Sequence, residues 1–189
     1  MSRPRGRPAQ GQGVTREAIL SAALGLLDED GAQFGMRALA ARLGVTPMSL
    51  YHHVGDRAGL LQALSDQVYG AVLEDDAEAA PGPAILALLI RYHDAVGRHP
   101  QLTLAIFAEP AAFAGVTRAI TGRLDALLSA LTPEPLLWRD ILVDHAHGSA
   151  LALCAARGAP QQAGAMREQY RRALARMLDS LAGPEPGPR

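Results

Sequence analysis

A short polar segment between Thr46 and His53 carries the side chains with the clearest chemical use in this chain. It opens with Thr46-Pro47, a good N-cap followed by proline at the first helical position. Around an apolar Leu50 it then presents hydroxyl, thioether, phenol and imidazole groups. Such groups form hydrogen bonds and apolar contacts with base edges and phosphates when a short helix enters the major groove of DNA. The segment therefore has the composition of a recognition helix.

Three further helices are predicted before and after this segment. The first follows the N-cap Thr15 and carries one apolar stripe before Gly31, made by Ile19, Ala22, Ala23, Leu26 and Leu27. The second covers residues 37–43, and Gly44 after it can take the left-handed backbone angle of a tight turn. Asp56 caps a third helix from Arg57 to about Leu73. Helix, glycine turn and short helix are the parts of a helix-turn-helix module.

Residues 14–64 resemble the TetR family of bacterial transcriptional repressors. The resemblance rests on Arg37-Ala38-Leu39-Ala40, Leu43-Gly44-Val45, Leu50-Tyr51-His52-His53-Val54 and Arg57-Ala58-Gly59-Leu60-Leu61. It implies a homodimer in which each subunit has a three-helix N-terminal DNA-binding domain and a divergent helical C-terminal domain. That second domain is expected to hold a small-molecule pocket and the dimer interface. One departure is Gly35-Met36, where the family often has a Ser or Thr cap for the second helix.

The resemblance also implies which residues contact DNA: Arg37, Thr46, Pro47, Met48, Ser49, Tyr51, His52, His53 and Arg57. An arginine at position 37 can bond both acceptors of a guanine edge, and Pro47 and Met48 can touch a thymine methyl group. Ser49, Tyr51, His53 and Arg57 suit phosphates, which fix register without reading sequence. The alternative for Tyr51 and His53 is packing inside the small core of the module.

The N-terminal arm carries a second DNA-binding signal. Arg3-Pro4-Arg5-Gly6-Arg7-Pro8 resembles an AT-hook, in which arginines lie in a narrow, A·T-rich minor groove. We expect Arg3, Arg5 and Arg7 to contact DNA in this way. The alternative is an arginine-rich tail that only raises solubility.

Composition favours an all-α protein. Alanine and leucine dominate, lysine and asparagine are absent, and no alternating β-branched runs occur. No Cys/His cluster has zinc spacing, and no Gly-x-Ser-x-Gly motif or phosphate-binding loop occurs, so we expect no cofactor, metal or catalytic site. The first 60 residues hold seven arginines against five acidic residues, so they sum to +2 and the remainder to −3, since the whole chain is −1. A lone Cys154, no long charge-free apolar run and no signal-like leader predict a cytoplasmic protein with no membrane partner.

The order of segments predicts four parts: a disordered arginine-rich arm (1–13), the DNA-binding domain (14–56), a helical ligand-binding and dimerisation domain (57–182) and a disordered tail (183–189). In the helical domain we predict helices over residues 84–98, 100–108, 110–131, 135–156 and 160–181. The last two are apolar on more than one face, which suits a four-helix interface between two chains. An ordinary monomer core is the alternative.

A ligand pocket is expected near four residues on apolar stripes of the helical domain: His93, Phe107, Trp138 and His145. Apolar walls with few polar groups suit a small molecule, and the low aromatic content predicts mostly aliphatic walls. The alternative is that both histidines are hydrogen-bonded core residues.

These patterns predict a ligand-responsive transcriptional regulator, most simply a repressor. A homodimer would bind a pseudo-palindromic operator, and a small-molecule effector would release it. Two alternatives stay open: a helical ligand-binding or enzymatic protein that only resembles a DNA reader, and an activator or architectural DNA binder without an effector.

Overall fold

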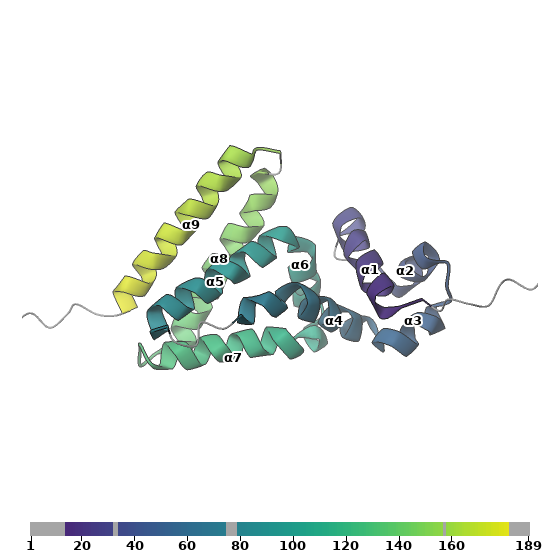
Figure 1. The fold of residues 1–189 in the computed structure, drawn as a ribbon, viewed down its shortest axis with the longest axis horizontal. Helices are drawn as coiled ribbons and strands as arrows, with labels where there is room; N and C mark the ends of the chain where they lie inside the picture. The colour runs from purple at the N-terminus through teal and green to yellow at the C-terminus, as the bar shows by residue number, and fades with distance from the viewer. Residues whose placement is uncertain (1–13, 32–33, 75–78, 157, 182–189) are drawn as a thin grey trace, which may run out of the picture.

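The computed structural model describes residues 14–31, 34–74, 79–156 and 158–181 of the 189-residue chain (Figure 1). Within them every regular element is helical, which confirms the all-α prediction. The α-helices are α1 (Arg16–Asp30), α2 (Met36–Leu43), α3 (Pro47–Val54), α4 (Arg57–Tyr69), α5 (Pro81–Arg98), α6 (Pro100–Ala108), α7 (Gly115–Ser129), α8 (Pro135–Ala152) and α9 (Pro160–Leu181). Short 3-10 helices cover Gly70–Leu73, Pro110–Ala112 and Leu153–Ala156.

Most predicted boundaries agree with these elements, and four differ. Helix α5 begins at Pro81, three residues before the predicted start at residue 84. The helix after Asp56 ends at Tyr69, and its last predicted turn is the 3-10 helix Gly70–Leu73. Likewise α8 ends at Ala152 and continues only as a 3-10 turn. The helix predicted over residues 110–131 is broken, since the 3-10 helix ends at Ala112, Ala114 is extended and α7 begins at Gly115.

Side-chain caps define the starts of the N-terminal helices. The Thr15 hydroxyl accepts the amide of Ala18 at 3.2 Å, and the Asp56 carboxylate accepts the amide of Gly59 at 2.8 Å. Gly35 precedes α2 and forms no side-chain cap, because glycine has no hydroxyl group. Helices α1, α2 and α3 gather at one end of the molecule, away from α8 and α9 (Figure 1). We call them the reading head.

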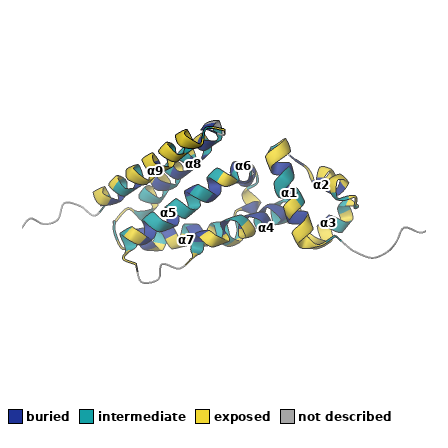
Figure 2. Cartoon of the chain, turned by 45° about the horizontal axis from the view of Figure 1, so that its top comes forward, coloured by how far each residue is buried: buried dark blue, intermediate teal, exposed yellow. Residues whose placement is uncertain are grey.

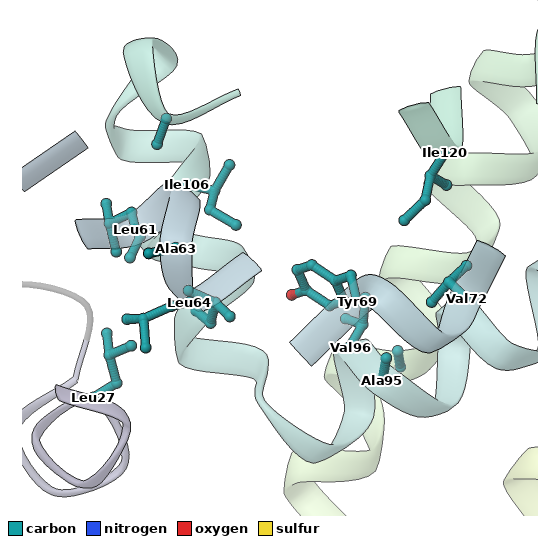
Figure 3. Packing of buried hydrophobic residues seen from close by; sticks show 14 of the residues in the cluster. Leu27, Leu61, Ala63, Leu64, Tyr69, Val72, Ala95, Val96, Ile106 and Ile120 are labelled. Atoms are coloured by element: carbon teal, nitrogen blue, oxygen red, sulfur yellow. The ribbon is translucent and has the colours of Figure 1, made fainter. Parts of the chain in front are cut away.

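Helix α4 joins this reading head to the rest of the fold. It packs against α1 and α3 on one side and against α6 and α7 on the other. Leu60, Leu61 and Leu64 are fully buried, because α4 is covered along both flanks. Figure 3 shows Leu61 and Leu64 between Leu27 of α1 and Ile106 of α6. One continuous core therefore runs from the reading head into the helical domain.

Helices α5, α7 and α8 pack against one another to form the centre of the helical domain, and α9 lies against α5 and α8. Tyr170, Leu174 and Leu178 bury one stripe of α9 at four-residue spacing, while its other side is exposed (Figure 2). On α8, three large apolar residues are exposed: Leu136, Leu137 and Ile141. Among the described residues, every helix is too short or too polar to span a lipid bilayer.

A specific contact holds α4 against the start of α7. The Asp66 carboxylate of α4 accepts the amide of Val116 at 2.9 Å, so it satisfies one of the free donors at the start of α7. Gly115 just before it has φ +53, and a Cβ atom there would lie 2.5 Å from the Asp66 oxygen. The joint between these two helices therefore requires glycine at position 115.

Replacing Gly115 with alanine tests this joint. We expect Gly115→Ala to lower the free energy of unfolding by about 1–2 kcal/mol from the left-handed backbone alone, and by more because the new Cβ displaces the Asp66 carboxylate. Gly122→Ala on the same helix is the matched control, because a Cβ there meets nothing within 4 Å. It should raise that free energy by about 0.5–1 kcal/mol. Urea unfolding measures both, and equal shifts in the two variants would contradict the account.

Candidate DNA-binding face and ligand cavity

The recognition helix α3 is fixed in the reading head by its cap and its inner face. The Thr46 hydroxyl accepts the amide of Ser49 at 3.3 Å, and Pro47 occupies the first helical position. Gly44, at φ +65, makes the preceding turn and bonds the last carbonyls of α2. Leu50 and Val54 are buried on the inner face of α3. The sequence therefore specifies which side of this eight-residue helix faces outward.

The outer face of α3 presents the predicted DNA-contacting side chains to solvent. Met48 is 63% exposed and Tyr51 is 42% exposed. Thr46, His52 and His53 are exposed as well, while Pro47 and Ser49 are half-buried. Tyr51 and His53 thus lie outside the core of the reading head. Arg37 is exposed on the neighbouring α2, where it makes no hydrogen bond or ion pair with any described residue.

Arg42 of α2 and Arg57 of α4, by contrast, have structural contacts. Arg42 binds both carboxylate oxygens of Glu29 at 2.5 and 2.8 Å, which ties α2 to α1 and holds the pKa of Glu29 below its ordinary value. Arg57 donates a hydrogen bond to the carbonyl of Phe34, and its guanidinium lies 5.3 Å from the Phe34 ring centre. Arg57 therefore attaches the start of α4 to the segment before α2. Arg3, Arg5 and Arg7 lie outside the described residues.

A cavity lies inside the helical domain, between α4, α5, α6, α7 and α8. Its volume, counted as the space open to the centres of water molecules, is about 80 Å³. A single water needs roughly 10–15 Å³ on that scale, so the cavity has room for a larger group. Its walls are Tyr69, Leu89, Tyr92, Thr103, Ile106, Phe107, Phe113, Thr117, Ile120, Thr121, Leu124 and Val143. Figure 3 shows Tyr69, Ile106 and Ile120, from three helices, directed toward this shared space.

Hydroxyl pairs and aromatic rings give the cavity its chemical character. The Tyr69 and Thr103 hydroxyls lie 2.8 Å apart, and the Tyr92 hydroxyl lies 2.6 Å from Nε2 of His147. Burial raises the pKa of Tyr69 to about 12 and also raises the pKa of Tyr92. Burial lowers the pKa of His147, because it disfavours the charged form of the imidazole. The walls are therefore uncharged at neutral pH.

Of the four residues predicted to line a pocket, the structure places only Phe107 in this cavity. His93 is 1% exposed, stacks on Tyr170 at 3.9 Å and lies with its Nε2 3.1 Å from the Ser149 hydroxyl. His145 also packs against Tyr170 and lines an open groove between α8 and α9. Trp138 packs against the core away from the cavity.

Four of the cavity residues that the sequence analysis did not predict share one detectable signal. Thr117, Ile120, Thr121 and Leu124 are spaced at i, i+3, i+4 and i+7, so they form one face of α7 with two hydroxyls on it. The mostly aliphatic walls expected from composition are not observed. Four of the eight aromatic residues in the chain line this cavity: Tyr69, Tyr92, Phe107 and Phe113. In the described parts of the chain, no three His, Cys, Asp or Glu side chains gather where they could hold a metal ion.

Comparison with known proteins identifies the reading head. The family model for bacterial regulatory proteins of the tetR family matches residues 19–64. A curated HTH-type transcriptional regulator from Saccharopolyspora erythraea is 45% identical over 60 residues. That match covers 31% of this chain and 25% of the relative, so the chain accounts for about a quarter of the relative's length.

Solved structures resemble the chain over a much longer span. Mycobacterium smegmatis BioQ is 25% identical, with 89% of this chain and 98% of that chain covered and a TM-score of 0.73. A structure of BioQ with its natural double-stranded DNA operator is 25% identical, covers 90% and 99% and has a TM-score of 0.68. The Streptomyces coelicolor TetR family protein ActR, in complex with (S)-DNPA, shares the fold at 23% identity, with 89% and 97% covered and a TM-score of 0.64. Residues 19–64 thus match the model of the tetR family of bacterial regulatory proteins, and the chain shares its fold with a solved TetR transcriptional regulator from Streptomyces coelicolor.

Proposed function

We propose that this protein is a transcriptional repressor that binds a pseudo-palindromic operator as a homodimer and leaves it when a small molecule enters the cavity. The observation that carries the proposal is the position of α4. Its first turn is capped by Asp56 and is attached to the segment before α2 through the Arg57–Phe34 contact. Its last residue, Tyr69, forms part of the cavity wall. One helix therefore touches both the DNA reader and the candidate effector site.

The coupling requires a difference in affinity between two conformations. An effector shifts the population only if it binds the DNA-incompatible arrangement more tightly than the DNA-compatible one. A shift from 1:99 to 99:1 takes about 5.5 kcal/mol of such preference. A ligand that moves Tyr69 would displace α4 and, through its rigid core of Leu60, Leu61 and Leu64, the reading head.

The homodimer is supported by the exposed apolar side chains of α8 and by the geometry of DNA. Leu136, Leu137 and Ile141 are large apolar side chains that lie in solvent on α8. Two half-sites one helical turn apart also need two reading heads related by a two-fold axis. The BioQ complex with its operator and the ActR complex with (S)-DNPA support DNA and a small molecule as partners for this fold.

Operator binding by fluorescence anisotropy tests the proposal. The labelled DNA would be the region flanking the protein's own gene, with random DNA as competitor, across a salt series. We expect selective binding of two protomers per site whose affinity falls steeply with salt. If selected genomic fragments also bind no more tightly than random DNA, the proposal is wrong.

Two arginine substitutions test whether Arg37 reads a base or only contributes positive charge. Arg37→Ala should weaken operator binding by about 1–3 kcal/mol and relax selectivity at one base pair, if Arg37 reads a guanine edge. Arg176→Ala is the matched control, because it removes an arginine from α9, far from the reading head. Anisotropy titrations of both variants should differ, and equal losses would argue against base reading by Arg37.

The cap of α3 offers a prediction that links stability to DNA binding. Thr46→Ala removes the hydroxyl that accepts the Ser49 amide, which should cost about 0.5–2 kcal/mol of unfolding free energy and weaken operator binding. Thr46→Ser retains a capping hydroxyl and should keep most of both. Urea unfolding and anisotropy on the same preparations measure the two effects. A stable Thr46→Ala variant with unchanged DNA affinity would contradict this role.

The N-terminal arm is tested by deletion. We expect a chain lacking residues 1–8 to bind its operator more weakly, with a salt slope flatter by about two to three units at about 0.9 per lost phosphate-equivalent contact. Anisotropy at several salt concentrations measures the slope. An unchanged slope would mean that Arg3, Arg5 and Arg7 do not contact DNA.

A further inference from the structure

The walls of the cavity disfavour a charged occupant. None of the described residues that line it carries a carboxylate, guanidinium or imidazole group. An anion would therefore lack a cationic partner there, and a cation would lack a carboxylate. Removing an unpaired charge from water costs several kcal/mol, which apolar contacts with a small ligand do not offset.

The hydroxyl groups in the walls leave few hydrogen-bonding positions for a ligand. Thr117 donates its proton to the carbonyl of Ala114 at 2.7 Å, and Thr121 donates to the carbonyl of Thr117 at 3.1 Å. Tyr69 and Thr103 share one of their two protons, so the second proton has no acceptor within the pair. That proton is placed to bond an acceptor atom in the cavity.

The aromatic side chains form a connected series along the cavity. The ring of Tyr69 lies 5.9 Å from that of Tyr92, and Tyr92 lies 5.4 Å from the His147 ring behind it. The His147 ring in turn meets Phe107 edge to face at 5.0 Å. Aromatic side chains favour offset or edge-to-face contact with another ring at such distances. Phe107 and Phe113 are 57% and 44% exposed, so this end of the cavity lies at the surface.

We propose that the cavity binds an uncharged, ring-bearing molecule with a hydrogen-bond acceptor, such as a carbonyl or ether oxygen, directed at the Tyr69–Thr103 hydroxyl pair. The ring lies against the aromatic series and enters past Phe107 and Phe113. This assignment of a ligand class rests on the proposed function, in which the cavity is the effector site. The raised pKa of Tyr69 agrees with it, because the phenol keeps its proton at neutral pH.

An organic cation is the main competitor for an aromatic cavity. Quaternary ammonium groups bind over aromatic faces, and such cages need no carboxylate in direct contact. The hydroxyl pair distinguishes the two cases, because an acceptor atom can bond its second proton, whereas a quaternary ammonium group cannot. A cationic probe therefore belongs in the test.

Three single-ring probes of similar size test the proposal: acetophenone, benzoate and phenyltrimethylammonium. Binding to the full-length protein would be followed by amide chemical-shift titration. We expect acetophenone to bind at least about tenfold more tightly than either charged probe, which corresponds to a difference of about 1.4 kcal/mol. Its shifts should centre on α6 and α7. Equal or tighter binding of a charged probe would overturn the proposal, and so would no binding of acetophenone at millimolar concentration.

Variants locate the bound probe. Phe107→Ala should weaken acetophenone binding by about two- to tenfold through loss of a ring contact, while Leu104→Ala, an exposed apolar residue of α6 outside the cavity, should not. The double variant Tyr69→Phe/Thr103→Val should weaken it by about two- to tenfold, because it removes both protons of the pair and leaves neither hydroxyl unpaired. Thr132→Val is the control outside the cavity.

Operator binding in the same samples separates this proposal from the proposed function. A protein that binds acetophenone in the cavity but no DNA selectively would refute the regulator and retain the ligand class. A protein that binds its operator but prefers a charged probe, or responds equally to Phe107→Ala and Leu104→Ala, would retain the regulator and refute the ligand class.

Discussion

The burial of α4 on both flanks is the constraint on which the rest of the structure depends. A helix that ends one domain and begins another is usually free to bend, but here Leu60, Leu61 and Leu64 are all fully buried. Each such leucine contributes about 1.5–3 kcal/mol when it is removed from water. Because cores are close-packed, we expect α4 to transmit a displacement at one end to the other. Asp56 and Arg57 hold its first turn, and Asp66 holds its last part against α7.

The two candidate sites, which α4 joins, direct their polar groups in opposite ways. The reading head presents its polar side chains outward from α2 and α3, on a frame of capped helices and the Arg42–Glu29 pair. At the cavity the polar groups lie inside the fold, where the Tyr69 hydroxyl pairs with that of Thr103 and the Tyr92 hydroxyl pairs with the His147 ring. The buried His93 and Tyr170 form, with the half-buried Ser149, a separate cluster that joins α5, α8 and α9. Its hydrogen bonds satisfy polar atoms that the core would otherwise leave without partners.

Local signals made much of the fold predictable from sequence. Thr15, Thr46 and Asp56 cap their helices as expected, and Gly44 takes the left-handed angle. These features depend on neighbours within a few residues, so they can be predicted from the local sequence. The break before α7 was missed, because it depends on Asp66, which lies 50 residues away from Val116.

The candidate sites show the same division. The outward face of α3 follows from the spacing of Leu50 and Val54 within one short helix. The cavity requires five helices to be placed relative to one another, and no periodicity within a single helix gives that arrangement. The sequence analysis predicted a pocket from histidines on apolar stripes. In the structure His93 is a hydrogen-bonded core residue beside Tyr170, which is the alternative that the sequence left open. The role of Arg57 also depends on a distant partner, Phe34.

Hydrogen exchange along α4 tests the central claim, that this helix links the reading head to the cavity, and it requires no identified effector. Amide exchange would be compared between the free protein and the protein bound to a selected operator fragment. The account predicts that DNA changes exchange along α4 as far as Tyr69 and at the cavity walls around Thr103 and Thr117. A change confined to α2, α3 and the first turn of α4 would contradict it, because the reading head would then act independently of the cavity.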